Sequence, residues 1–197
     1  MDFPYRSAYI NNMSAKQKPD DISSFTDTIL ENLTNGEAWS NLSFGPYQTG
    51  DIYLELLKKI DAGVEQDIDL NLLSEPAKDR LFEVLMLRFD ILNEHRDAYR
   101  ALFIETFKNP KLFRIALPQF HQSMELMLRL ADLNGRDDRS CAPMRVGGIA
   151  LVYLNAVRVW LNDDSADMSA TMAELDNGLS KIDMAFDRMP EFLRSFI

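Results

Sequence analysis

Apolar residues recur along most of this chain every three or four positions, which is the spacing of one face of an α-helix. Alternation typical of strands is nearly absent, and glycine and proline are scarce at eight residues each. The first predicted helix is capped by Asp20 and Asp21 and ended by Gly36. The later predicted helices are Asp51–Ala62, Ser74–His95, His95–Asn109, Pro110–Leu133, Met144–Leu161 and Met168–Met189. We therefore predict an all-α protein of about eight or nine helices.

Local signals set the expected helix ends. Ser74 is expected to cap a helix that has Pro76 in its first turn, and Ser165 is expected to cap the last helix. Pro118 lies inside a helical pattern, so it should kink that helix or split it in two. The one clear polar loop is "NGRDDRSCAP", residues 134–143.

Composition and charge narrow the class of protein. The 197 residues are enough for one domain with a core, and 46% of them are hydrophobic. The net charge of -10 opposes non-specific binding to nucleic acid or to an anionic membrane, unless the basic residues gather on one face. The single cysteine, Cys141, excludes an internal disulfide. It is expected to be a loop thiol without a role, and the protein to be cytoplasmic.

No segment has the pattern of a secretion signal or a membrane anchor. Residues 1–19 lack a basic segment followed by an apolar run, so we expect them to be a disordered leader. The longest apolar stretch, Val146–Leu161, is shorter than the roughly 20 residues that span a bilayer, and Arg158 interrupts it. This stretch is therefore expected to be a buried helix.

The residue types that usually carry catalysis or bind metals form no known motif. His95 and His121 are the only histidines, and neither lies in an HExxH or Cys/His spacing. His95 is expected at the surface or at a helix cap. The pairs Asp137–Asp138 and Asp163–Asp164 lack further ligands at calcium-site spacing and are expected to be solvated turn residues. Without a GxSxG, P-loop or GxGxxG motif, we predict neither an enzyme nor a bound cofactor or metal.

Aromatic and methionine side chains gather on the helices before the polar loop, where they can line an adaptable apolar pocket. For His121 the main alternative to a ligand contact is a satisfied polar residue at the pocket rim. For the apolar members the alternative is ordinary core packing. The candidate ligand-binding residues are Phe103, Phe107, Phe113, Phe120, His121, Met124 and Met127.

Two stretches resemble the regulatory domain of TetR-type transcriptional regulators. The stretch "KDRLFEVLMLRFDILNEHRDAYRAL" (Lys78–Leu102) is similar to the first long helices of that domain. The stretch Gly148–Phe186, with its "VWLNDDS" and "TMAELDNGL", is similar to its last two helices. The resemblance covers about residues 51–188 and implies a TetR-like helical bundle with a ligand pocket. The same features are similar to a ubiquinone-biosynthesis lipid-binding family that has this fold but does not act on DNA.

The region before residue 51 matches the TetR pattern poorly. Trp39, Leu42 and Ser43 fit the start of a helix-turn-helix, but the sequence then continues as "FGPYQTGDIY". Proline and glycine are costly inside a helix, by about 3 and about 1 kcal/mol respectively. No Lys or Arg lies between Ser40 and Asp51 to meet a phosphate. We therefore expect residues 20–50 to be a remnant that lacks a recognition helix, and specific DNA binding to be absent.

Residues 51–197 are expected to form a ligand-binding and dimerisation domain. An apolar helix such as Val146–Leu161 must be covered on every side, and one amphipathic helix covers only part of it. A two-fold four-helix bundle, which the resemblance also implies, would cover the rest. The expected interface residues are Tyr153, Val157, Trp160, Met172, Leu175, Leu179 and Ile182.

The leading hypothesis is a non-enzymatic homodimer that binds an apolar small molecule, such as a lipid or an isoprenoid. The main alternative is a TetR-family transcriptional regulator that acts through a divergent DNA contact or through a partner regulator. A third hypothesis is a protein-interaction adaptor that binds no ligand.

Overall fold

The computed structural model describes residues 22–133 and 142–187. Over these ranges the chain forms seven α-helices and two short 3₁₀ helices, and no strand. The all-α prediction is confirmed, although eight or nine helices were expected. The elements are α1 (Ile22–Thr34), η1 (Trp39–Asn41), α2 (Thr49–Asp67), η2 (Leu70–Ser74), α3 (Ala77–Glu94), α4 (Arg96–Lys108), α5 (Pro110–Leu130), α6 (Ala142–Trp160) and α7 (Ser169–Asp187).

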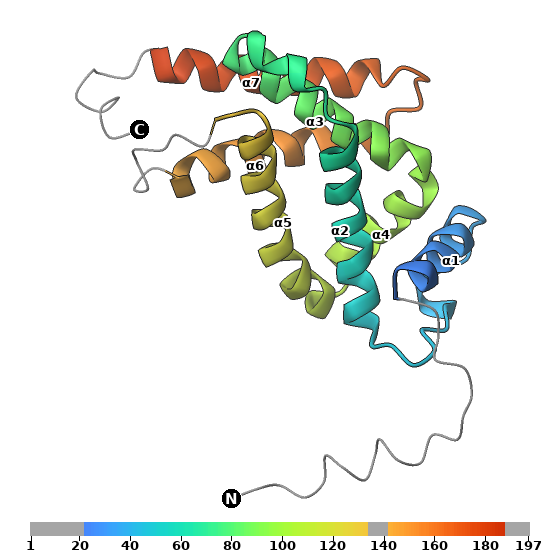
Figure 1. The fold of residues 1–197 in the computed structure, drawn as a ribbon. Helices are drawn as coiled ribbons and strands as arrows, with labels where there is room; N and C mark the ends of the chain where they lie inside the picture. The colour runs from blue at the N-terminus through green and yellow to red at the C-terminus, as the bar shows by residue number, and fades with distance from the viewer. Residues whose placement is uncertain (1–21, 134–141, 188–197) are drawn as a thin grey trace, which may run out of the picture.

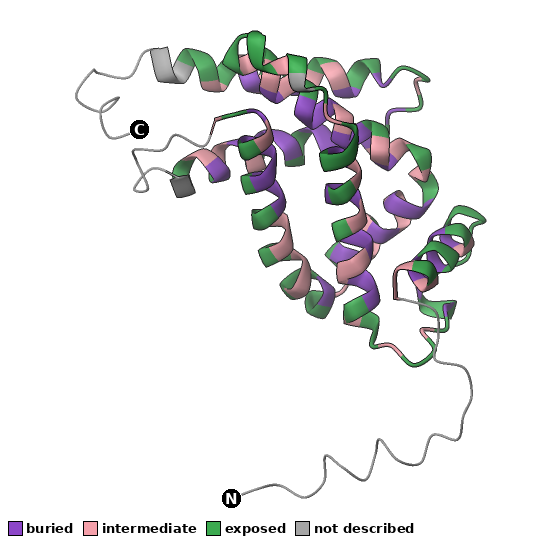
Figure 2. Ribbon diagram, in the orientation of Figure 1, coloured by how far each residue is buried: buried purple, intermediate pink, exposed green. Residues whose placement is uncertain are grey.

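The helices pack against one another around one shared core. Helices α6 and α7 lie along each other, and α3 packs against α7 (Figure 1). Helix α2 contacts both α3 and α5, while α4 joins α5 to α1. The buried sides of these helices face one another, and their exposed sides form the outer surface (Figure 2). The interior is a single apolar cluster that reaches from Ile29 in α1 to Leu179 in α7.

Two glycines near predicted helix ends behave differently. Gly36 adopts φ +87° just after α1, as expected of a residue that ends a helix. Gly63 does not end α2, which continues to Asp67. A Cβ on Gly63 would lie 2.8 Å from the Ile91 Cδ1 atom of α3. This glycine therefore allows close packing between α2 and α3, and packing outweighs its low helix propensity.

The expected cap at Ser74 is wrong. Ser74 lies in η2, where its hydroxyl donates to the Asn71 carbonyl oxygen at 3.0 Å. Helix α3 starts one residue after Pro76, without a side-chain cap. The nearby carboxylate of Asp69 serves η2 instead, by accepting from the Asn71 N–H at 2.9 Å.

Pro118 does not split α5, which runs without interruption from Pro110 to Leu130. A proline lacks the N–H that would bond to the carbonyl four residues earlier, here that of Arg114. Both residues are exposed, so water can serve that carbonyl and the helix continues. This continuity accounts for one of the helices that the sequence predicted in excess.

The segment between α1 and α2 contains no α-helix. Its residues 35–48 include only the single 3₁₀ turn η1. The Trp39 ring packs 5.0 Å from Phe44 and 6.0 Å from Tyr53 of α2, measured between ring centroids. These contacts fix the segment against α2 in an irregular conformation.

The turn before α7 corrects the expectation for Asp163. This residue is buried rather than solvated, and its Oδ2 atom accepts from the Thr171 N–H at 2.8 Å and from the Thr171 hydroxyl at 2.7 Å. Burial raises the pKa of the Asp163 carboxyl, but hydrogen bonds from Ser165 and Thr171 outweigh burial and hold the pKa well below its usual range. Ser165 was expected to cap the last helix, and its Oγ accepts from the N–H of Ser169, the first residue of α7, at 3.1 Å. Asp164 is exposed, as predicted.

Some of the expectations lie outside the described residues. They are the disordered leader over residues 1–19, the capping of the first helix by Asp20 and Asp21, most of the polar loop over residues 134–143, the Asp137–Asp138 pair and the role of Cys141.

Candidate functional site

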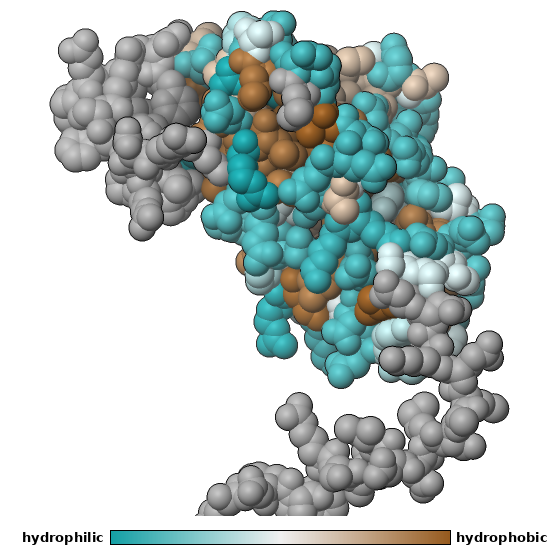
Figure 3. Space-filling model, in the orientation of Figure 1, coloured by the Kyte–Doolittle hydropathy of each residue, from teal (hydrophilic) through white to brown (hydrophobic). Residues whose placement is uncertain are grey.

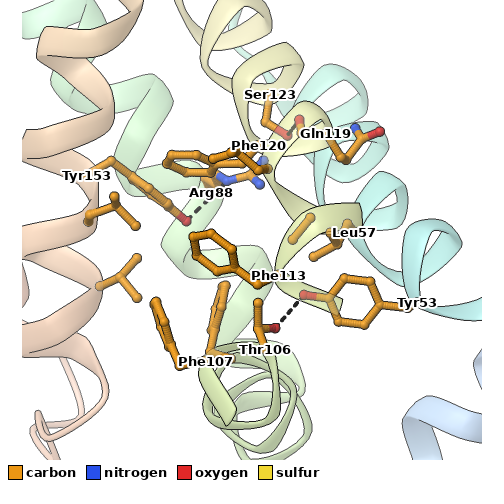
Figure 4. Close-up of a pocket in the computed structure, with 15 residues that line it drawn as sticks. Tyr53, Leu57, Arg88, Thr106, Phe107, Phe113, Gln119, Phe120, Ser123 and Tyr153 are labelled. Atoms are coloured by element: carbon orange, nitrogen blue, oxygen red, sulfur yellow. Dashed lines mark hydrogen bonds between the residues drawn. The ribbon is translucent and has the colours of Figure 1, made fainter. Parts of the chain in front are cut away.

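A cavity of about 150 Å³ lies among α2, α4, α5 and α6, and one residue of α3 reaches it. Fifteen residues line it, most of them apolar (Figure 4). Four of the lining side chains, Phe107, Phe113, Leu117 and Leu154, are also exposed at the surface, by 64%, 45%, 55% and 42%. These exposed side chains mark the mouth of the cavity, so it is open to a molecule from solvent.

Four of the predicted ligand-binding residues meet at this cavity. Phe103 and Phe107 reach it from α4, and Phe113 and Phe120 reach it from α5. The rings of Phe107 and Phe113 lie 6.4 Å apart at the mouth, and the Phe120 ring lies 6.1 Å from that of Tyr153. The aromatic residues of the two helices therefore form one wall.

The other three predicted residues do not line the cavity. His121 points to solvent, with its Nδ1 atom 3.7 Å from Glu125 Oε1. Met124 and Met127 are fully buried in the core, one to two turns further along α5 than Phe120, and do not line the cavity. The second histidine, His95, lies at the junction of α3 and α4, within 3.3 Å of the Thr34 hydroxyl.

Arg88, which lines the cavity, belongs to a buried ion pair with Asp61, which does not line it. The Arg88 guanidinium donates through Nη1 to Asp61 Oδ1 and through Nε to the Tyr153 hydroxyl at 3.1 Å. The other oxygen of Asp61 accepts from the Ser123 hydroxyl at 2.7 Å and from Gln119 Nε2 at 3.0 Å. Burial lowers the pKa of Arg88, but Tyr153 and Asp61 more than compensate and raise it above its ordinary value. Arg88 and Asp61 therefore neutralise each other, and both are hydrogen-bonded to neighbouring polar side chains.

A second, uncharged polar pair lies on the opposite wall. The Tyr53 hydroxyl is hydrogen-bonded to the Thr106 hydroxyl, which itself donates to the Leu102 carbonyl oxygen at 2.7 Å. Because Thr106 has one hydroxyl proton and uses it on Leu102, Tyr53 must be the donor to Thr106. Burial raises the pKa of Tyr53, with the bond to Thr106 opposing this, so the phenol is neutral at physiological pH.

Sequence reasoning missed these polar residues, although it had a signal for two of them. Arg88 lies on the apolar stripe of α3, seven positions after Leu81 and four before Leu92. Asp61 lies on the buried face of α2, between Leu57 and Val64. A charged residue at helical spacing within an apolar stripe is expected to be buried, and a buried charge needs a partner. Which partner it finds is a matter of tertiary structure.

The structure places the predicted dimer residues mostly inside the chain itself. Tyr153, Val157, Trp160, Leu175 and Leu179 are buried against the protein's own helices, while Met172 and Ile182 are partly buried. The five buried side chains have no surface to offer a second copy. Helix α6 instead exposes Met144, Leu151 and Leu154, by 63%, 68% and 42%.

A second hollow of about 390 Å³ lies where α3, α5, α6 and α7 meet. Part of the apolar surface in Figure 3 lies over this junction. Leu81, Ile149 and Leu179 form its apolar floor, and Lys78 and Asp183 are at its edge.

Neither a metal centre nor a membrane span is found in the described part of the chain. No group of three His, Cys, Asp or Glu side chains there could hold a metal ion. None of its helices is both long and apolar enough to cross a bilayer.

No family model, curated protein or solved structure matches the chain.

Proposed function

We propose that the protein is a non-enzymatic binding protein that takes an apolar small molecule into the cavity between α4, α5 and α6. The observation that carries this proposal is the mouth of the cavity, where Phe107, Phe113 and Leu117 are exposed beside an apolar interior. Apolar side chains exposed together on a protein surface often mark a binding site. An apolar ligand would cover them and gain the free energy of their burial.

The volume limits the ligand. A cavity of about 150 Å³ lined by apolar side chains is known to hold a molecule such as benzene. The enclosed part of the ligand should therefore have about the bulk of one aromatic ring. A longer lipid or isoprenoid chain would extend through the mouth, along Phe107 and Leu117. This fits the ligand-binding role that the resemblance to TetR-type regulatory domains implies.

The alternative of a TetR-family regulator has weaker support. The segment of residues 35–48 contains one 3₁₀ turn and no α-helix, and there is no Lys or Arg between Ser40 and Asp51. A helix that enters the major groove and cations that meet phosphates are what a helix-turn-helix needs. A mobility-shift titration against the DNA upstream of the protein's own gene tests the alternative. A competitor-resistant shift at nanomolar concentration would favour it over our proposal.

The proposal extends to a homodimer formed through the outer face of α6. That face carries Met144, Leu151 and Leu154, and a Cβ added at Gly147 would meet no atom within 4 Å. Leu154 also lines the cavity, so a second copy on this face would narrow the mouth. Sedimentation equilibrium should give twice the chain mass of 22.6 kDa. The variant Leu151→Asp should give the monomer mass.

The matched control for the dimer is Leu73→Asp, because Leu73 is 53% exposed on η2, away from α6. This variant should remain dimeric. A wild-type mass equal to one chain at high micromolar concentration would contradict the homodimer, and dissociation by both variants would place the interface elsewhere.

A cavity-filling substitution tests the ligand site. Ala116 lines the cavity, so Ala116→Leu adds three carbon atoms inside it. We expect this variant to lose binding of α-methylstyrene, a one-ring hydrocarbon, in isothermal titration calorimetry. The control Ala170→Leu makes the same change at an exposed position of α7 and should bind as the wild type does. Unchanged binding in Ala116→Leu would show that the hydrocarbon binds elsewhere, whereas no binding by the wild type would refute the proposal.

A further inference from the structure

We propose that the cavity selects an apolar ligand carrying a neutral carbonyl group, and that the Tyr153 hydroxyl donates the hydrogen bond that recognises it. This inference rests on the proposed function, since it names the chemical class of ligand for the same cavity. Tyr153 is 2% exposed and reaches the cavity from α6. In Figure 4 its hydroxyl points into the space that the lining side chains enclose.

The hydrogen-bond pattern gives Tyr153 a proton to donate. Its oxygen accepts from Arg88 Nε at 3.1 Å, and an arginine can only donate. The phenol proton must therefore point away from Arg88. Among the described residues none accepts it in a hydrogen bond. A buried hydroxyl usually has a partner for its proton, so a ligand acceptor in the cavity would complete this pattern.

The other hydroxyls of the cavity have already used their protons. Ser123 donates to Asp61, and Tyr53 donates to Thr106. Both carboxylate oxygens of Asp61 are occupied, so this acidic group does not present a free acceptor to the ligand. The end of the cavity at Arg88 and Tyr153 is thus rich in donors, and it matches a group that only accepts.

Charge decides between a neutral acceptor and a carboxylate. The Arg88 guanidinium is already neutralised by Asp61, which lies behind the cavity lining. A ligand carboxylate would add a negative charge that has no unpaired cation to meet, which is costly in a buried site. A ketone, aldehyde or ester gains the hydrogen bond without burying a charge. Burial raises the pKa of Tyr153, against the opposing effect of Arg88, so its proton is present at neutral pH.

The orientation of the ligand follows from the two ends of the cavity. Its carbonyl oxygen faces Tyr153, and its apolar body lies among the phenylalanines toward Phe113 and Phe107 at the mouth. The enclosed volume fits a one-ring ketone better than a bulkier compound.

The test compares two molecules of nearly the same shape, acetophenone and α-methylstyrene, which differ by C=O against C=CH₂. Calorimetry should give acetophenone a dissociation constant about fivefold lower, the effect of one hydrogen bond. The variant Tyr153→Phe should remove this preference and still bind α-methylstyrene. The control Tyr99→Phe deletes a buried phenol that does not line the cavity, and it should keep the preference. The infrared carbonyl stretch of bound acetophenone should lie at a lower frequency in the wild type than in Tyr153→Phe.

Each other outcome has a separate meaning. Equal binding of the two molecules, or tighter binding of the hydrocarbon, would overturn the carbonyl preference and leave the proposed function standing. Binding of neither would overturn both. A preference that persists in Tyr153→Phe would remove Tyr153 from the recognition. Benzoate binding more tightly than acetophenone would overturn the argument from charge. The comparison within the wild type does not depend on whether the variant folds.

Discussion

The close packing of α6 on α7 depends on one glycine, and this can be tested by adding a single methyl group. Gly178 lies in the middle of α7, opposite Val152 of α6. A Cβ at Gly178 would lie 2.6 Å from Val152 Cγ1 and 3.2 Å from Cγ2. Val152 is buried, and a β-branched side chain in a helix is held to one rotamer, so it cannot turn aside. The helices would have to separate.

The sign of the Gly178→Ala effect follows from two opposing terms. Alanine in place of glycine stabilises a helix interior by about 1 kcal/mol. Overpacking a closely packed core costs about 1–3 kcal/mol. We therefore expect Gly178→Ala to destabilise the protein by about 1 kcal/mol. Gly147→Ala is the matched change in α6, where an added Cβ meets no atom within 4 Å, and it should stabilise by up to about 1 kcal/mol.

Urea unfolding followed by circular dichroism measures both effects, provided that the m-value does not change. A third measurement isolates the contact. When Val152 is first replaced by alanine, the clash is absent and Gly178→Ala should become stabilising, which gives a coupling energy of about 1–3 kcal/mol between the two sites. If Gly178→Ala stabilises the wild type as much as Gly147→Ala does, this result would contradict the close contact between α6 and α7 at Gly178.

Three further predictions concern the core and the cavity wall. Arg88→Met should cost about 3–5 kcal/mol of unfolding free energy because Asp61 is left buried without its cation, and the double variant with Asp61→Leu should recover most of the loss. The folded-state pKa of Asp163 is depressed, so its contribution is complete above the unfolded-state pKa of about 3.9 and is lost as pH falls through the folded-state value. The difference in unfolding free energy between wild type and Asp163→Asn should thus be constant above about pH 5 and shrink below pH 4, and a difference that grows in acid would contradict this. Met127→Ala should cost about 2–5 kcal/mol in urea unfolding without changing hydrocarbon binding, because Met127 is core and does not line the cavity.

The elements of this fold could be predicted from the sequence where the signal is local. The apolar spacing at Ile29 and Leu33 gives α1, and the Asn109–Pro110 pair ends α4 and starts α5 as predicted. The same spacing placed aromatic residues of α4 and α5 near one another, and four of them line the cavity. These features depend on residues a few positions apart, which a single sequence presents directly.

Local signals failed where packing between distant segments opposed them. Gly63 has the propensity to end α2, but contact with Ile91 of α3 keeps the helix intact through it. Asp163 looked like a solvated turn residue, but Thr171, eight positions later, brings two donors to it in the interior. The energy of such contacts exceeds the roughly 1 kcal/mol of a helix propensity.

It follows from the sequence alone that the chain is helical and that Val146–Leu161 is apolar on nearly every side. The sequence did not determine which side meets which neighbour, because a helix that is apolar all round carries no pattern to orient it. Only the tertiary structure turned Tyr153 toward Arg88, 65 positions earlier in the chain, and left Leu151 at the surface. The donor-rich end of the cavity exists because helices distant in sequence bring those groups together, and no spacing along one helix encodes that meeting.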